Sequence, residues 1–193
     1  PANTSSIESV IENSSSRKDL ARVYNAGLNL LARREHSCKE LEQKLVKRFA
    51  PPLVQQAIND LRSNGLLSDE RFAEALIHAR SGKGYGPRYI AQELAQKGIA
   101  KELSGELLDE RDPQWMARAT EVALKKLRTT PRLAEAIRQL DDDDASLEDA
   151  RERQQQRFQA KQKLSSFLGR RGFSSETVQR AVEIVAATNQ GVR

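Results

Sequence analysis

The stretch "LAQKGIAKE" (residues 94–102) returns near the end of the chain as "LGRRGFSSE" (residues 168–176). A shift of 74 residues aligns leucine with leucine, a basic residue with a basic residue and glycine with glycine: Leu94 with Leu168, Lys97 with Arg171, and Gly98 with Gly172. Leucine and glycine serve packing and turning, and neither can act as an acid, a base or a nucleophile. The repetition therefore predicts a structural unit that is used more than once, rather than a catalytic signature.

A related segment precedes these two copies. A shift of 49 residues aligns Gly86 with Ser37, Leu94 with Leu45, and Lys97 with Arg48. Apolar residues four positions apart line one face of a helix, and glycine then permits a sharp reversal into a second helix. The first copy has "FAPP" in place of the glycine, so its two prolines are expected to end one helix and begin the next. One such unit cannot bury its apolar face alone, and stacked neighbours would supply the core.

Start and stop signals of helices recur along the chain. Ser37 with Glu40 predicts a capping box, and Ser68 before two acidic residues predicts a second N-cap. We expect proline at the first position of a helix at 87, 113 and 131. Period-2 runs are lacking, so the predicted fold class is all-α, an elongated array of three tandem three-helix modules. The predicted helices are 20–35, 38–49, 52–63, 69–81, 87–97, 100–110, 113–128, 131–140, 147–171 and 174–187.

The predicted organisation has a tail followed by three modules. The first residues are rich in Ser, Asn and Glu with few apolar anchors, which is typical of a mobile segment. The predicted bounds are a mobile N-terminal tail at 1–18, module 1 at 19–66, module 2 at 67–111, and module 3 at 112–188 with an acidic insertion around 129–152 that contains the acidic stretch 141–149.

The charge of the chain is unevenly distributed around a net value of +5. Basic residues outnumber acidic ones by seven to three in 21–50 and again in 111–140, and by six to two in 161–193. Residues 141–160 carry three basic and seven acidic side chains. Such blocks indicate contact with nucleic acid or with an acidic protein surface; the alternative is a set of ordinary solvated helix faces.

The same composition bears on the cellular setting. Cys38 is the only cysteine, which excludes an internal disulfide and fits a reducing compartment. The first residues lack a basic start followed by an apolar run, so no signal peptide is predicted. No apolar stretch approaches the length that spans a bilayer. We therefore expect a cytoplasmic protein without a membrane partner.

Three stretches resemble the RecX family of bacterial recombination regulators: "LLARREHSCKELEQKL" (30–45), "SDERFA" (68–73) and "GPRYIAQELAQKGI" (86–99). The resemblance covers about residues 28–110 and 157–185. It implies an elongated, curved all-α protein that binds the RecA–DNA filament and restrains its activity, with no enzymatic activity and no cofactor. The implied partners are the RecA recombinase filament and the single-stranded DNA within it, with weak direct DNA binding by what we expect to be a monomer.

The candidate contact residues are basic, with one tyrosine. The helix expected at 38–49 places a basic ridge opposite its apolar face, and this ridge could meet DNA phosphates, acidic residues of a filament, or solvent alone. The glycine-rich loop "SGKGYGPRY" lacks the features of a P-loop and is expected to be flexible and exposed. Basic pairs near helix ends could instead complement the helix dipole. The candidates are Lys39, Lys44, Lys47, Arg48, Lys83, Tyr85, Arg88, Lys125, Lys126, Arg170 and Arg171.

Two other classes of function remain open from the residues. A helical DNA-binding regulator that acts without a recombinase is favoured by "PPLVQQAIND" (51–60), whose Gln and Asn side chains could reach base edges. An enzyme is disfavoured, because no nucleophile–base set and no metal-ligand spacing is evident. Aromatic residues make up 5% of the chain, so DNA affinity should be directed mainly at phosphates and should depend strongly on salt.

Overall fold

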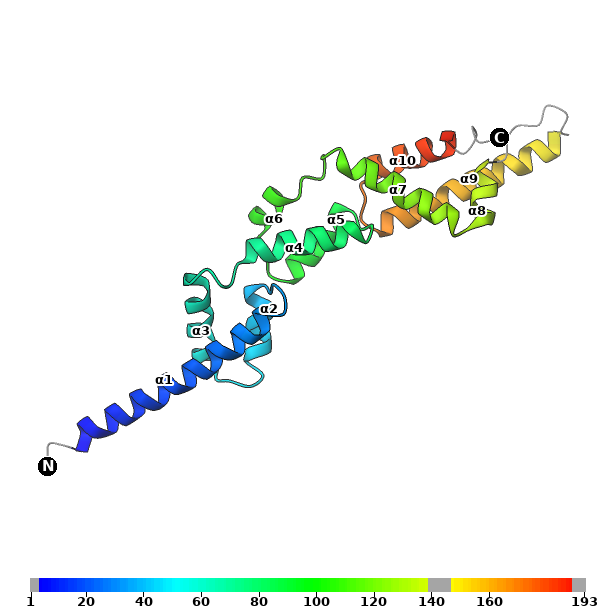
Figure 1. The fold of residues 1–193 in the computed structure, drawn as a ribbon. Coiled ribbons are helices and arrows are strands. Elements are labelled where there is room, and N and C mark those ends of the chain that lie inside the picture. Colours follow the sequence, from blue (N-terminus) through cyan, green and yellow to red (C-terminus); the bar gives the residue numbers. More distant parts are fainter. Residues whose placement is uncertain (1–3, 139–146, 189–193) are drawn as a thin grey trace. The chain divides into compact units, whose positions relative to one another are not determined.

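The computed structural model describes residues 4–138 and 147–188, and every regular element in these two ranges is a helix (Figure 1). This confirms the predicted all-α class. The helices are α1 (Thr4–Leu31), α2 (Cys38–Leu45), α3 (Pro51–Ser63), α4 (Asp69–Gly82), α5 (Pro87–Gln96), α6 (Lys101–Leu107), α7 (Gln114–Arg128), α8 (Pro131–Arg138), α9 (Leu147–Arg170) and α10 (Ser175–Thr188).

Several helix bounds differ from the predicted ones. Helix α1 begins at Thr4 rather than near residue 20, because its first turns are rich in serine and asparagine and carry no start signal. Helix α2 ends at Leu45, four residues earlier than predicted, and Pro113 is the N-cap of α7 rather than its first residue. The predicted mobility of residues 1–18 stays a prediction. Residues 141–146 of the acidic stretch lie outside the described residues.

The chain divides into two compact units. The first unit comprises residues 1–76 and 94–107. In it, α1 packs against α2 and α3, and α2 also packs against α3 (Figure 1). The apolar stripes of these amphipathic helices meet in one core, as their spacing predicts. The buried core residues are Val23, Leu41, Leu45, Val54, Ala57, Ile58, Leu61 and Leu67.

The second unit comprises residues 77–93 and 108–193. Here α7 and α9 both pack against α10, and α8 packs against α7 and α9. Small side chains on α7 and α10 allow their backbones to approach closely. The buried apolar residues of these helices include Ala119, Ala123, Leu127, Leu164, Leu168, Val178, Ala181, Val182 and Val185.

The two repeated glycines end α5 and α9 as the sequence predicts. Gly98 has φ +83° and Gly172 has φ +88°, a left-handed conformation that an L-residue with a Cβ rarely adopts. In each case the next apolar residue, Ile99 or Phe173, is buried and its N–H bonds back to the leucine that begins the repeat. The echoed segment is therefore the same helix stop used twice.

Helix caps follow the sequence in part. The hydroxyl oxygen of Ser37 accepts the N–H of Glu40 at 3.1 Å, and that of Ser68 accepts the N–H of Arg71 at 3.2 Å. Both predicted N-caps are therefore present. The reciprocal half of the predicted capping box is absent, because the Glu40 carboxylate binds Arg34 and Lys97 instead.

The helices of the described residues also bear on a membrane role. None of those within 4–138 and 147–188 combines the length with the apolar character that crossing a bilayer requires.

Candidate basic interface

A junction between repeats recurs once in each unit. In the first unit, the hydroxyl of Ser37 at the start of α2 donates to the carbonyl of Lys97 at the end of the α5 repeat, at 2.7 Å. In the second unit, the N–H of Gly86 before α5 donates to the carbonyl of Arg171 at 2.7 Å. The repeat aligns Ser37 with Gly86 and Lys97 with Arg171. Equivalent positions therefore make equivalent contacts.

The second junction holds the glycine-rich loop in place. The Arg171 guanidinium donates to the carbonyls of Lys83 and Gly84, at 2.8 and 3.2 Å, and the N–H of Arg88 donates to the carbonyl of Gly172 at 3.0 Å. The basic side chains of the loop, Lys83 and Arg88, are exposed as predicted, and its predicted flexibility stays a prediction. Its contact with Arg171, which lies 88 residues away from Lys83 in sequence, could not be foreseen.

Tyr85, expected to be exposed with its loop, makes two contacts through its ring. Its ring stacks on Tyr89 with centroids 4.2 Å apart, and the guanidinium carbon of Arg171 lies 5.2 Å from its centroid. Such stacked and cation–π contacts occupy both the ring and the cation. Tyr85 is half-buried in this arrangement, so it supports the junction.

Basic side chains from α7, α8, α9 and the glycine-rich loop gather along two adjoining grooves of the second unit. The grooves have volumes of about 550 and 460 Å³ and share Lys126 and Phe167. Of the described residues that line them, Glu121 is the one carboxylate. We call this set the basic surface, and its cations are Lys83, Arg118, Lys125, Lys126, Arg132, Lys163, Arg170 and Arg171.

Phe167 lies at the centre of the basic surface. The ammonium of Lys126 and the guanidinium carbon of Arg171 lie 5.3 and 5.0 Å from its ring centroid. Cations held over an aromatic ring lose little further entropy when they meet an anion. Lys126 therefore presents a positive charge held near one position, whereas the guanidinium of Arg171 is already engaged by the carbonyls of Lys83 and Gly84.

Five of the predicted contact residues lie on the basic surface: Lys83, Lys125, Lys126, Arg170 and Arg171. Arg118, Arg132 and Lys163 were missed. Helical spacing could have found two of them, because Arg118 precedes Lys125 by seven residues and Lys163 precedes Arg170 by seven. Residues seven apart lie on one helix face.

The predicted ridge of the first unit is divided by the structure. The aliphatic stem of Lys39 covers Gly98, so a Cβ at position 98 would lie 2.7 Å from the Lys39 Cδ. Lys47 is exposed. Lys44 and Arg48 line a separate groove of about 750 Å³ between α1 and α2. The four cations therefore do not form one continuous face.

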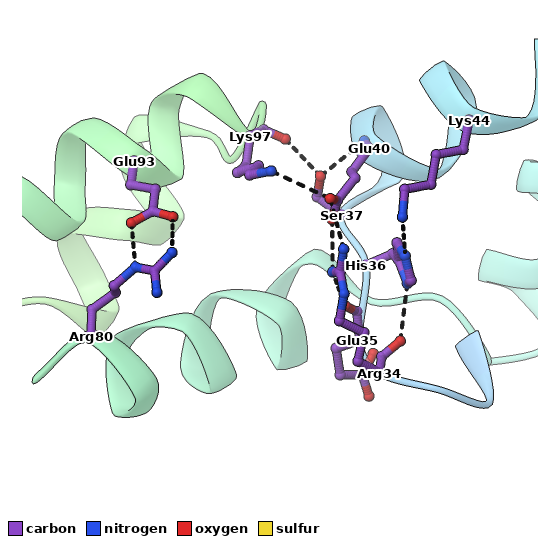
Figure 2. Close-up of polar contacts among 9 residues, drawn as sticks. All are labelled: Arg34, Glu35, His36, Ser37, Glu40, Lys44, Arg80, Glu93 and Lys97. Atoms are coloured by element: carbon purple, nitrogen blue, oxygen red, sulfur yellow. Dashed lines mark hydrogen bonds and ion pairs between the residues drawn. The ribbon is translucent and has the colours of Figure 1, made fainter. Parts of the chain in front are cut away.

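Lys44 is also held from below by a buried histidine (Figure 2). Its ammonium lies 3.0 Å from Nε2 of His36, while Nδ1 of His36 lies 3.0 Å from the carbonyl of Arg34. A carbonyl only accepts and an ammonium only donates, so the imidazole is neutral with its proton on Nδ1. Burial, together with the charges of Arg34 and Lys44, lowers the pKa of His36.

The Glu40 carboxylate forms ion pairs with two cations at the first junction (Figure 2). Arg34 donates to both of its carboxylate oxygens at 2.9 Å, and the ammonium of Lys97 lies 3.3 Å away. The hydrogen bonds from Arg34, helped by the charges of both cations, hold the pKa of Glu40 at about 2 against the effect of its burial. A bidentate arginine–carboxylate pair of this kind also fixes geometry.

Two further arginines are occupied by carboxylates of their own unit. Arg80 donates to both oxygens of Glu93 at 2.6 Å (Figure 2), and this pairing raises the pKa of Arg80. Arg88, a predicted contact residue, pairs with Glu110 at 3.1 Å, and both side chains are largely exposed. An exposed ion pair of this kind contributes little to the stability of the fold, and each side chain can form other ion pairs.

Two further observations concern the cysteine and the metal-ligand groups of the described residues. Burial, and next the charge of Asp69, raise the pKa of the Cys38 thiol to about 11, which keeps it protonated and weakly nucleophilic at neutral pH. Within residues 4–138 and 147–188, no group of three or more His, Cys, Asp and Glu side chains could hold a metal ion.

These features define an all-helical protein that is built from repeated three-helix modules and displays basic grooves. Three parts of the chain match family descriptions: residues 24–61 the first three-helix domain of RecX, 68–108 the second and 148–182 the third. The chain belongs to the RecX family of regulatory proteins.

Individual relatives agree with this assignment. A "Regulatory protein RecX" of Ectopseudomonas mendocina is 35% identical over 159 residues, which cover 82% of this chain and 91% of the relative. One of Halorhodospira halophila is 44% identical over 101 residues, or 52% of this chain, and that match spans 63% of the relative, less than two thirds of its length. The RecX crystal structure from Lactobacillus salivarius superposes with a TM-score of 0.67 at 20% identity, over 89% of this chain and 99% of that one, and supports the fold alone.

Proposed function

We propose that the protein binds RecA and its single-stranded DNA filament and negatively modulates RecA activity, namely filament extension, ATP hydrolysis and strand exchange. Family membership supports this proposal, because the relatives are named regulatory proteins. The single observation that carries it within this chain is the basic surface, where eight cations line two grooves with one carboxylate among the described lining residues. A nucleoprotein filament offers the regular negative charge that such a surface attracts.

The proposed mode of action is binding rather than chemistry. We propose that the binding modules span residues 19–66, 67–111 and 112–188. A mobile tail at 1–18 precedes them, and the third contains an acidic insertion around 129–152. Weak contacts on tethered modules add up to strong binding, because each later contact forms at high effective concentration. A protein bound across several filament subunits would oppose their rearrangement and so slow ATP turnover.

The test adds the protein to RecA filaments preformed on single-stranded DNA and follows ATP hydrolysis. The wild type should inhibit turnover, and K125E/K163E/R170E should lose most of that inhibition, since all three side chains are exposed on the basic surface. The matched control is R111E/R151E/R180E, which makes the same charge change on exposed side chains of the same unit outside the surface.

The control should inhibit nearly as well as the wild type. No inhibition by the wild-type protein at any ratio would overturn the function itself. Sequence-specific binding to duplex DNA in a gel shift, combined with no effect on RecA, would favour a DNA-binding regulator that acts without a recombinase. Equal losses in both triple variants would remove the basic surface from the proposal and leave only net charge.

A further inference from the structure

A separate groove lies in the first unit. It has a volume of about 750 Å³ and runs between α1 and α2. Arg22, Asn25, Asn29 and Arg33 of α1 and the turn after it line the groove, as do Lys44 of α2 and Arg48 of the turn that follows. Its remaining lining residues are apolar: Ala26, Leu30, Leu45 and Phe49.

The polar residues along α1 form a regular row. Arg22, Asn25 and Asn29 are three and four residues apart on α1, which places one hydrogen-bond donor on each successive turn, and Arg33 lies two residues beyond the end of the helix. The three helical positions are separated by roughly 5–6 Å along the axis and extend over roughly 10 Å. A periodic row of donors suits a polymer whose charges are also periodic.

The charged side chains that line the groove are all basic. None of the described residues that line it is acidic. Arg22 has an exposed ion pair with Asp19 at 3.4 Å, whereas the guanidinium groups of Arg33 and Arg48 have no carboxylate within reach among the described residues. Arg48 instead lies 5.7 Å from the ring centroid of Phe49. Arginine without a protein partner is well suited to bind phosphate bidentately.

The groove includes a turn that other copies of the repeat use for packing. Lys97–Gly98 contacts the start of α2, and Arg171–Gly172 contacts the start of α5. Arg48 is the aligned residue of the first copy, and no carbonyl of its turn accepts a hydrogen bond from another copy among the described residues. The side chain of Arg48 is exposed and lines the groove.

We propose that the groove between α1 and α2 binds the sugar–phosphate backbone of a single-stranded nucleic acid. The α1 row and the two cations opposite would take phosphates, while the apolar floor with the half-buried Phe49 ring would lie against sugars or bases. A hydrated inorganic ion would gain nothing from contact with that apolar floor. The charges of an acidic peptide are not regularly spaced. The inference rests on the proposed function, because it assigns this groove to the DNA strand of the filament.

The test measures fluorescence anisotropy of a labelled single-stranded oligonucleotide without any recombinase, over a series of salt concentrations. R33Q/R48Q should bind on the order of ten-fold more weakly than the wild type. The slope of log affinity against log salt should fall in magnitude by about 1.4, as expected for two lost phosphate contacts to a single strand. The control K47Q/K101Q, on exposed side chains of the same unit outside the groove, should retain both affinity and slope.

A second variant tests the amide donors without changing charge. N25A/N29A should weaken binding several-fold while the salt slope stays the same, because hydrogen bonds are lost and counterion release is kept. Both residues lie on an α1 face, where alanine favours the helix, so circular dichroism should show an intact fold.

Three results would overturn the inference. One is an unchanged affinity in R33Q/R48Q, and another is an equal loss in R33Q/R48Q and K47Q/K101Q. The third is a polyglutamate peptide that displaces the oligonucleotide at lower concentration than unlabelled DNA does. Loss of strand binding in R33Q/R48Q would support the groove even if the wild type failed to inhibit RecA, so the two proposals fail separately.

Discussion

The two junctions between repeats occupy equivalent positions and are built from different groups. At the first, a side-chain hydroxyl of Ser37 bridges to the Lys97 carbonyl, and charged side chains surround it. At the second, backbone bonds to backbone, from Gly86 to Arg171 and from Arg88 to Gly172. The first junction therefore depends on side chains that can adjust, whereas the second has main chains in direct contact in addition to the side-chain hydrogen bonds of Arg171.

Replacing glycine should be tolerated differently at the two junctions, because a side chain lies beside one glycine and main chain lies beside the others. A Cβ on Gly98 would meet only the stem of Lys39, a flexible side chain. A Cβ on Gly172 would meet the backbone nitrogen and Cβ of Tyr89, and one on Gly86 would lie 2.6 Å from the Gly172 carbonyl. Backbone cannot move aside as a side chain can. The turns at Gly98 and Gly172 have nearly the same φ, yet they should differ in how well they tolerate a side chain.

The largest effect is expected from Gly172→Ala. The new methyl group would collide with the Tyr89 backbone and would also occupy a positive φ, so the variant should lose roughly 3 kcal/mol or more of unfolding free energy. Trp115 is buried in the second unit and is the only tryptophan of the chain. Its fluorescence therefore reports the denaturation of that unit, and a midpoint equal to that of the wild type would contradict the difference between the junctions.

The comparison also shows what sequence patterns can and cannot reveal. Ser37, Gly98 and Gly172 were identified from sequence because caps and helix stops depend on residues within one or two turns. The partners of these residues were not, because the contact of Arg171 with the Lys83 carbonyl joins positions 88 residues apart. Spacing within one copy carries no information about which surface the next copy meets.

The candidate site follows the same rule. Lys125, Lys126 and Arg170 were identified as members of basic pairs, and their convergence on one surface depended on how α7 packs with α9. Tyr85 was expected to be exposed because its loop is rich in glycine, yet its ring stacks on Tyr89. Local sequence supplied the charges, and tertiary packing decided which of them remain available.

The next largest loss of stability is expected from Glu40→Gln at the first junction, and it should depend on pH. The folded pKa of Glu40 is about 2 and its usual value is 4.5, so its stabilising contribution is complete above pH 4.5 and is lost as the pH falls from 4.5 towards 2. Glu40→Gln should destabilise the first unit by about 2 kcal/mol at pH 7, and the difference from wild type should vanish near pH 2. Denaturation followed by circular dichroism at several pH values measures this.

Glu42→Gln provides the control for that experiment, because Glu42 is exposed on the same helix and has no ion pair among the described residues. It should lower stability by no more than a few tenths of a kcal/mol at any pH. If Glu40→Gln shifted the Trp115 transition as strongly as the circular dichroism transition, the charge cluster would not be specific to the first junction.

A smaller loss is expected from Ser37→Ala. The substitution removes both the cap to the Glu40 N–H and the bridge to the Lys97 carbonyl, and it should cost about 1–2 kcal/mol. Ser63→Ala is the comparison, since Ser63 is exposed and donates only to the Asn59 carbonyl one turn earlier. Amide hydrogen exchange should accelerate at residues 97–99 in Ser37→Ala alone, and equal protection in both variants would argue that the bridge contributes nothing.

The smallest effect is expected from Gly98→Ala, the counterpart of the first substitution. Its cost should be about 1 kcal/mol, because the positive φ is retained at a penalty while the Lys39 stem can move away from the new methyl group. Chemical denaturation of Gly98→Ala and Gly172→Ala side by side gives the ratio of the two costs. A ratio near one would mean that backbone conformation alone sets the cost of the turn, whereas a ratio of about three or more would mean that the contacted backbone of Tyr89 does.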